Sequence, residues 1–170
     1  AGFADHYIPE DAWPDLIRQL EETGRTDNLV EAAKDAGESP LAAQQTEIDR
    51  CFGGEALGDI LTDLGHADSA FAQDTLKLLQ RNAPLSMAAT VEMLHRLRAG
   101  TMSIRKALEL EYRFTHRAME KGDFLEGIRA QIIDKDRQPK WQYADRDVPT
   151  TAVSQMLMPL GADTLRFEEE

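Results

Sequence analysis

Apolar residues recur at helical spacing along most of the chain. Leu57, Ile60, Leu61 and Leu64 stand at i, i+3, i+4 and i+7, which is the pattern of one helical face. The pattern therefore predicts a mainly α architecture of short helices, with no internal repeat and no linker to mark a domain boundary. Comparable stripes, most of them ended by glycine or proline, predict helices that begin near Asp11, Thr26, Leu41, Asp68 or Ser69, Ser86, Ser103, Asp123 and Thr151.

Residues 2–8, GFADHYI, are the one convincing strand candidate, and Pro9 ends them. A single strand cannot satisfy its own backbone N–H and C=O groups or make a stable sheet. We therefore expect this orphan strand to pair with a segment outside the chain or with another copy of it.

The stretch from Asp123 to Trp141, DFLEGIRAQIIDKDRQPKW, is the most distinctive in the chain. Asp123 is the predicted N-cap of a helix, and Glu126 is expected to reach back to it as in a capping box. The helix then meets a charged segment at residues 134–137, and Pro139 is expected to end it. Its apolar face consists of Leu125, Ile128, Ile132 and Ile133.

The chain is strongly acidic, with 31 Asp and Glu against 19 Lys and Arg and a formal charge of −12. Such a surface repels nucleic acid and anionic lipid, although a local basic patch could still bind a small anion. No apolar run approaches the ~20 residues of a membrane-spanning helix. The start lacks the features of a signal peptide. Together with the single Cys51, these features favour a reducing compartment, and we expect the cytoplasm.

Isolated reactive side chains have simpler structural explanations. The four histidines have no spacing typical of a metal site, so no metal is predicted. Cys51 is interpreted as a small buried hydrophobe, and Ser86 as an N-cap behind Pro84. Glu111 lies near an apolar stripe, where it could transfer protons with a raised pKa or, as we favour, form an ion pair with Arg105, Arg129 or another base. No catalytic residue is predicted within the chain.

Several segments, taken in order, resemble one family. They are AGFADHYIP at 1–9, EIDRCF at 47–52, APLSMAATVEMLHRLRAG at 83–100, SIRKALELEYRFTHRAMEKGDF at 103–124, and the stretch at 123–141. Together they resemble the C-terminal part of the 3-hydroxyisobutyryl-CoA hydrolase branch of the crotonase (enoyl-CoA hydratase/isomerase) superfamily. The residues expected to carry the structural signature are Asp123, Glu126, Gly127, Arg129 and Trp141.

The resemblance implies a fold and a division of the chain. Residues 1–9 would be a strand of a crotonase core (α/β, ClpP/crotonase-like), and residues 10–170 the helical C-terminal region. In the family the oxyanion-hole N–H groups and the catalytic carboxylates lie upstream of the position that matches Ala1. The chain would then work with a missing N-terminal core or a neighbouring subunit.

For the complete protein the resemblance implies hydrolysis of a short acyl-CoA thioester in valine catabolism, with CoA entering only as part of the substrate. Hydration or isomerisation of enoyl-CoA is the alternative within the superfamily. A noncatalytic helical module that packs on a partner protein is an alternative outside it.

Lys135, Arg137 and Lys140 form the one basic cluster in the distinctive stretch. One interpretation is that they bind the phosphates of CoA; the other is a solvated face neutralised by Asp134 and Asp136. In hydratases of the superfamily the equivalent helix supplies an aromatic and a basic residue near the CoA nucleotide. Gln131 stands at the aromatic position here, and the segment is about two residues longer than in those hydratases.

Overall fold

The computed structural model describes residues 3–101 and 103–167, and their secondary structure is helical. The chain divides into two compact units, Ala1–Glu47 and Ile48–Glu170, although the sequence shows no boundary there. The division falls inside one short helix, α4 (Gln45–Cys51). Among the described residues no helix combines the length and the apolarity needed to cross a membrane.

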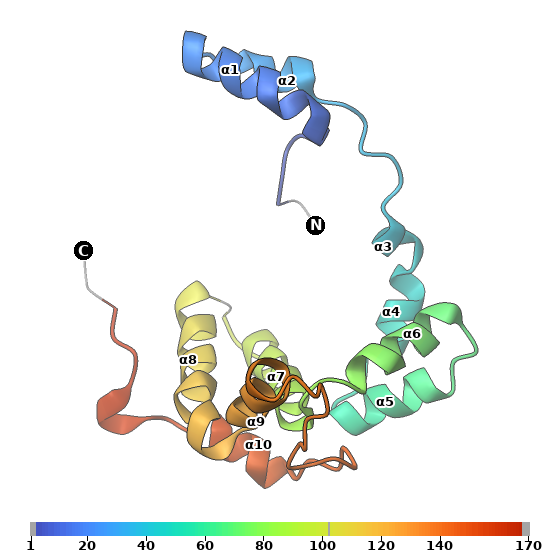
Figure 1. The fold of residues 1–170 in the computed structure, drawn as a ribbon, viewed down its shortest axis with the longest axis vertical. Coiled ribbons are helices and arrows are strands. Elements are labelled where there is room, and N and C mark those ends of the chain that lie inside the picture. Colours follow the sequence, from blue (N-terminus) through green and yellow to red (C-terminus); the bar gives the residue numbers. More distant parts are fainter. Residues whose placement is uncertain (1–2, 102, 168–170) are drawn as a thin grey trace. The chain divides into compact units, whose positions relative to one another are not determined.

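The first unit is built on two helices that pack on each other, α1 and α2 (Figure 1). Gly24, with a φ of 65°, ends α1 in the left-handed conformation that glycine adopts most easily. Leu16 is buried, whereas Trp13 and Ile17 on the same predicted face are about half exposed. The elements of this unit are η1 (Glu10–Ala12), α1 (Trp13–Thr23), α2 (Asp27–Ala32) and α3 (Pro40–Ala43).

The predicted strand at 2–8 is not formed. Residue 2 lies outside the described residues, and residues 3–8 take part in one isolated antiparallel bridge, Tyr7 with Lys34. The Lys34 N–H donates to the Tyr7 carbonyl at 2.9 Å. A strand needs a row of such bonds with a neighbouring strand, and helical segments cannot supply that row.

The second unit holds the longer helices, and α7 packs against both α8 and α10 (Figure 1). The helix predicted to begin near Leu41 is interrupted at Gln44, between α3 and α4. The remaining elements are α5 (Leu57–Gly65), α6 (Ala70–Leu79), α7 (Pro84–Arg98), α8 (Ile104–Lys121), α9 (Phe124–Ile128), the π-helix η2 (Arg129–Ile133), α10 (Thr150–Met156) and η3 (Gly161–Asp163).

Serine caps fix the start of two of these helices, as the sequence predicts. The Oγ atoms of Ser69 and Ser103 accept from the backbone N–H groups of Ala72 and Lys106, at 3.0 and 3.3 Å. The prediction for Ser86 is wrong. Helix α7 already begins at Pro84, which tolerates the first position because it has no N–H to satisfy, so Ser86 lies inside the first turn.

Two apolar clusters form the core of the second unit. One joins α4, α5 and α6 and contains Cys51, Ile60, Leu64, Ala67 and Ala72. The other joins α7 to α10 and contains Leu85, Ala89, Val153, Met156 and Leu157. Cys51 is fully buried, as predicted for a small hydrophobe.

Candidate functional site

A tight turn between α8 and α9 starts the distinctive stretch. A Cβ added to Gly122 would lie 2.9 Å from the Ala118 carbonyl oxygen, so a larger residue would clash with the last turn of α8. Asp123 follows and is 6% exposed. Its side chain does not cap α9; instead Oδ1 accepts from the backbone N–H of Gln142 at 2.9 Å. Asp123 thus stands at the N-cap position of α9 as predicted, but the predicted capping bond is wrong, because the N–H of a residue nineteen positions on binds this carboxylate.

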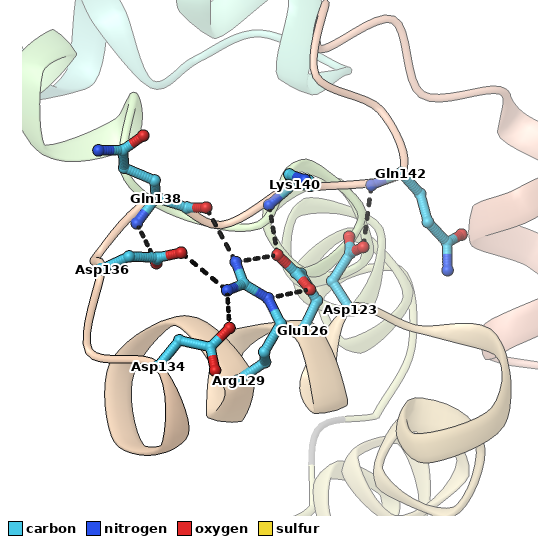
Figure 2. Close-up of polar contacts among 8 residues, drawn as sticks. All are labelled: Asp123, Glu126, Arg129, Asp134, Asp136, Gln138, Lys140 and Gln142. Carbon is cyan, nitrogen blue, oxygen red and sulfur yellow. Dashed lines mark hydrogen bonds and ion pairs between the residues drawn. The ribbon is translucent and has the colours of Figure 1, made fainter.

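Glu126 does not close a capping box either. Its two carboxylate oxygens accept from Nε and Nη2 of Arg129 at 2.9 and 2.8 Å, a two-pronged pair of the kind that guanidinium favours (Figure 2). Oε1 also accepts from the backbone N–H of Lys140 at 2.6 Å. The side chain that was expected to reach back thus points toward the residues that follow the helix.

Arg129 is the centre of this polar network (Figure 2). Besides Glu126, its Nη1 donates to the carboxylates of Asp134 and Asp136, and its Nη2 to the Gln138 carbonyl at 3.0 Å. These partners occupy Arg129, one of the bases that the sequence offered as an ion-pair partner of Glu111. Glu111 is exposed on α8, and the described ion pair of that helix joins Glu109 to Arg113 at 3.8 Å.

The hydrogen bonds of the network shift the pKa values of Glu126, Asp136 and Arg129. The hydrogen bond from Arg129, followed by that from the Lys140 N–H, lowers the pKa of Glu126 from 4.5 to about 2. Hydrogen bonds from Arg129 and from the Gln138 N–H lower the pKa of Asp136. The same carboxylates, Glu126 first, raise the pKa of Arg129 further above its ordinary value. These shifts favour the charged forms of Glu126, Asp136 and Arg129 at neutral pH.

The helix ends earlier than the sequence suggests. After α9 the chain widens into the π-helix η2, whose last turn closes with a bond from the Asp134 N–H to the Arg129 carbonyl at 2.8 Å. Residues 134–142, which we call the strap, then run back along the helix. Lys135 and Arg137 in the strap, and Arg146 just beyond it, have φ values of 56°, 55° and 65°. This left-handed conformation is costly for residues with a side chain, and such strain is often found at functional sites.

A hollow of about 970 Å³ lies beside the strap, and we call it the basic hollow. Four cationic side chains line it and, among the described lining residues, none is acidic. In a chain with a net charge of −12 this is a marked local reversal of charge. The lining consists of Gln80, Arg81, Gln131, Arg137, Pro139, Lys140, Trp141, Ala144 and Arg146.

The predicted basic cluster is only partly brought together. Arg137 and Lys140 line the basic hollow, whereas Lys135 is not part of the lining. Arg81 and Arg146, which sequence reasoning missed, complete it. Arg81 stands more than fifty residues before the strap, so no spacing rule could connect the two. Arg146 is joined to the end of α6 by a bond from its Nη2 to the Gln80 carbonyl at 3.1 Å.

Trp141 lies between the basic hollow and an apolar one. The second hollow, of about 330 Å³, is formed by α7, α8 and α9, and both hollows include Gln131 and Trp141 in their linings. A Cβ added to Gly127 would lie 3.7 Å from Cη2 of Trp141, so the indole packs directly over α9 at this glycine. Within the described residues, no group of three or more His, Cys, Asp or Glu could hold a metal ion.

The arrangement can therefore bind an anion with a flat, apolar part. The comparison with known proteins agrees with the resemblance found in the sequence. The model of the enoyl-CoA hydratase/isomerase family matches residues 1–157. The chain belongs to this family.

Curated relatives share about a third of the residues with the chain over the aligned regions. A mitochondrial 3-hydroxyisobutyryl-CoA hydrolase of Rattus norvegicus is 35% identical over 122 residues, which cover 71% of this chain and 31% of the relative. The enzyme of the same name from Dictyostelium discoideum is 31% identical over 171 residues, covering 94% of this chain and 44% of the relative. The chain thus spans less than half the length of these relatives.

Solved structures of the family share the fold. A crystal structure titled as an enoyl-CoA hydratase from Rhodobacter sphaeroides is 48% identical, with a TM-score of 0.85. One titled as a carnitinyl-CoA dehydratase from Mycobacterium thermoresistibile is 32% identical, with a TM-score of 0.87. The matches cover 98% and 99% of this chain and 48% of each of the two structures. The chain therefore shares its fold with about half of each of these proteins.

Proposed function

We propose that the chain supplies the CoA-nucleotide-binding surface of an acyl-CoA-processing enzyme, a 3-hydroxyisobutyryl-CoA hydrolase that cleaves its thioester in valine catabolism. The basic hollow is the observation that carries the proposal, and the names of the curated relatives support the reaction. CoA carries a 3′-phosphate and a diphosphate beside an adenine ring. A cluster of Arg and Lys beside an indole ring offers the matching chemistry.

Arg81, Arg137, Lys140 and Arg146 would neutralise the phosphates. Arginine is well suited to this role because its planar fork donates two hydrogen bonds at once, whereas Lys140 contributes a point charge. Trp141 lines the same hollow, so its ring could stack on adenine while the cations hold the phosphates. The interpretation of the cluster as a face neutralised by Asp134 and Asp136 fits less well, because both carboxylates are hydrogen-bonded to Arg129.

Thioester hydrolysis needs paired donors aimed at the developing oxyanion and a positioned group that activates water. The basic hollow offers cations for binding and no acidic lining residue among those described. We therefore expect residues 1–170 alone to bind CoA without hydrolysing 3-hydroxyisobutyryl-CoA or hydrating crotonyl-CoA. Thiol release and crotonyl-CoA hydration measure these activities, and turnover in either assay would contradict the expectation.

CoA binding can be followed through Trp141. The chain has two tryptophans, so a Trp13→Phe background leaves Trp141 as the single indole fluorophore. Titration with free CoA should change its fluorescence. The variant with Arg81, Arg137 and Lys140 changed to Ala should bind about tenfold more weakly or worse, with the larger difference at low salt.

A matched control removes the same charge elsewhere. Lys77, Arg96 and Lys106 lie on α6, α7 and α8, outside the lining of the basic hollow. Changing these three to Ala should leave the affinity for CoA near that of the parent, and Lys135→Ala should do the same. Equal affinity in the two triple variants would refute the nucleotide site.

A further inference from the structure

Arg129 contacts both the helix and the strap, yet it is not part of the lining of the basic hollow. Its Nε, Nη1 and Nη2 all donate to groups of the protein: Glu126, Asp134, Asp136 and the Gln138 carbonyl (Figure 2). With its hydrogen-bonding atoms occupied in this way, Arg129 is poorly placed to bind a ligand itself. Any effect on ligand binding would have to pass through the strap.

The strap is held at alternate residues. Asp134, Asp136 and the Gln138 carbonyl are bound by Arg129, and the Lys140 N–H is bound by Glu126, the partner of Arg129. The residues between them include Arg137, Pro139 and Trp141, which line the basic hollow. Lys140 lines the hollow too, although its backbone N–H is held by Glu126. One set of contacts thus fixes the strap to the helix and leaves the side chains of Arg137, Lys140 and Trp141 at the hollow.

The strap needs such fixing because its backbone is strained. Lys135 and Arg137 both have positive φ values, and residues with side chains persist in this conformation when surrounding contacts over-determine it. A bond from the Arg137 N–H to the Ala130 carbonyl at 3.0 Å adds one more tie. Without Arg129, the strap would lose the three hydrogen bonds that this side chain donates to it and could relax to an ordinary extended form.

Arg129 also separates the charges of the strap. Asp134 and Asp136 alternate with Lys135 and Arg137 in the sequence and, if free, could pair with the neighbouring cations. In the structure both carboxylates bind Arg129. Among the described residues no ion pair joins a carboxylate to Arg137 or Lys140, whereas Glu126, Asp134 and Asp136 all pair with Arg129. The two cations thus remain available to an external anion.

We propose that Arg129 is a positioning residue for the basic hollow: it clamps the strap and keeps Arg137 and Lys140 turned toward a phosphate-bearing ligand. The inference rests on the proposed function and adds to it a residue that never contacts the ligand. Nearby basic residues thus have two roles. Arg129 positions the strap, whereas Arg137 and Lys140 bind the ligand.

The test compares three variants in the Trp13→Phe background. The first is the single variant Arg129→Gln, the second is the double variant Arg137→Gln with Lys140→Gln, and the third is the triple variant that combines all of these changes. Free CoA is the probe, read by Trp141 fluorescence. We expect Arg129→Gln to weaken CoA binding about tenfold, as does the loss of a charge-assisted hydrogen bond. Because Arg129 acts through the other two cations, the combined variant should bind little more weakly than Arg137→Gln with Lys140→Gln.

Amide hydrogen exchange separates positioning from general stability. Arg129→Gln should raise exchange at the N–H groups of Arg137 and Lys140, while the amides of α7 keep their protection. Arg96→Gln is the matched control, because Arg96 forms a single ion pair with Glu92 on α7 and should change neither readout. If the Gln variant does not fold, Arg129→Lys keeps a cation without the fork and should show the same changes at smaller size.

Three outcomes would overturn the inference. Unchanged exchange at Arg137 and Lys140 in the Arg129 variant would show that no clamp exists. Fast exchange with unchanged CoA affinity, or effects that add fully in the combined variant, would show that the clamp does not act on binding. Unchanged affinity in Arg137→Gln with Lys140→Gln would instead refute the nucleotide site, and the positioning role with it.

Discussion

The two units of the chain show the same kind of helical pattern with different results. In the first unit, Leu16 is the one buried side chain among residues 3–47. In the second unit, two clusters of buried residues and a network around Arg129 hold helices that are no more amphipathic in sequence. An amphipathic stripe therefore specifies a helix, but stability comes from what covers the stripe.

The comparison is sharpest for one kind of side chain. Leu64 in α5 is 1% exposed, and Leu41 in α3 is 67% exposed, although both occupy predicted apolar positions. Burial of a leucine contributes roughly 1.5–3 kcal/mol, and truncating a buried one also leaves a cavity. The second unit should therefore carry most of the stability of the chain.

The largest expected effect is that of Leu64→Ala. It should reduce the free energy of unfolding by about 2–5 kcal/mol, the range for buried leucines. Leu41→Ala should change the free energy by less than about 0.5 kcal/mol, as exposed substitutions usually do. Urea unfolding followed by circular dichroism measures both. Similar losses for the two variants would mean that the units do not differ as the burial indicates.

A smaller effect tests the strain in the strap. Lys135 is exposed with a φ of 56°, and glycine adopts this conformation without the steric cost borne by other residues. Lys135→Gly should therefore raise the free energy of unfolding by about 0.5–1 kcal/mol, after the entropy that glycine adds to the unfolded chain. Lys77→Gly, inside α6, should instead lower it by about 1 kcal/mol. A loss at Lys135 would argue against a strained strap.

Much of the helical fold follows from the sequence because its signals are local. Ser69 and Ser103 begin their helices as predicted, and the apolar face of α5 is buried at Leu57, Ile60 and Leu64. The errors have a physical cause too. Asp123 and Glu126 carry a helix-start signal, but Gln142 and Lys140 supply competing donors from the strap. Contacts between residues so far apart override local preference.

The candidate site is less accessible to sequence reasoning. Arg137 and Lys140 stand out because they share a short segment. Lys135 shares that segment, yet it does not line the basic hollow. Arg81 and Arg146 reach the hollow from other parts of the chain, which only the folded structure, with the bond from Arg146 to the Gln80 carbonyl, reveals. Basic residues that are close in sequence are therefore a poor guide to a basic site in space where, as at Lys135 and Arg137, the backbone takes the left-handed conformation.

The smallest effect concerns acid, and its sign follows from the lowered pKa of Glu126. A group whose pKa is lower in the folded chain stabilises that state at pH values above its unfolded pKa, near 4.5, and the contribution is lost as the pH falls through about 2. The lowered pKa of Asp136 acts in the same direction. As the pH falls from about 4.5 to about 2, the strap should therefore loosen from the helix. The effect should be modest, because water screens charges at the surface.

Hydrogen exchange at the Lys140 and Gln142 amides, measured from pH 6 to 2 and corrected for intrinsic rates, follows the loosening directly. Glu126→Gln removes the titrating group, so its strap should already exchange faster at pH 6 and depend less on pH. Glu111→Gln, an exposed change on α8, should behave as the parent does. In the first unit the described ion pairs of Arg18 with Asp15 and Arg25 with Asp27 are 60–78% exposed, so they should contribute little to any loosening of α1 and α2. Equal acid dependence of the strap in the parent and Glu126→Gln would show that apolar packing, and not the Arg129 network, holds the strap in place.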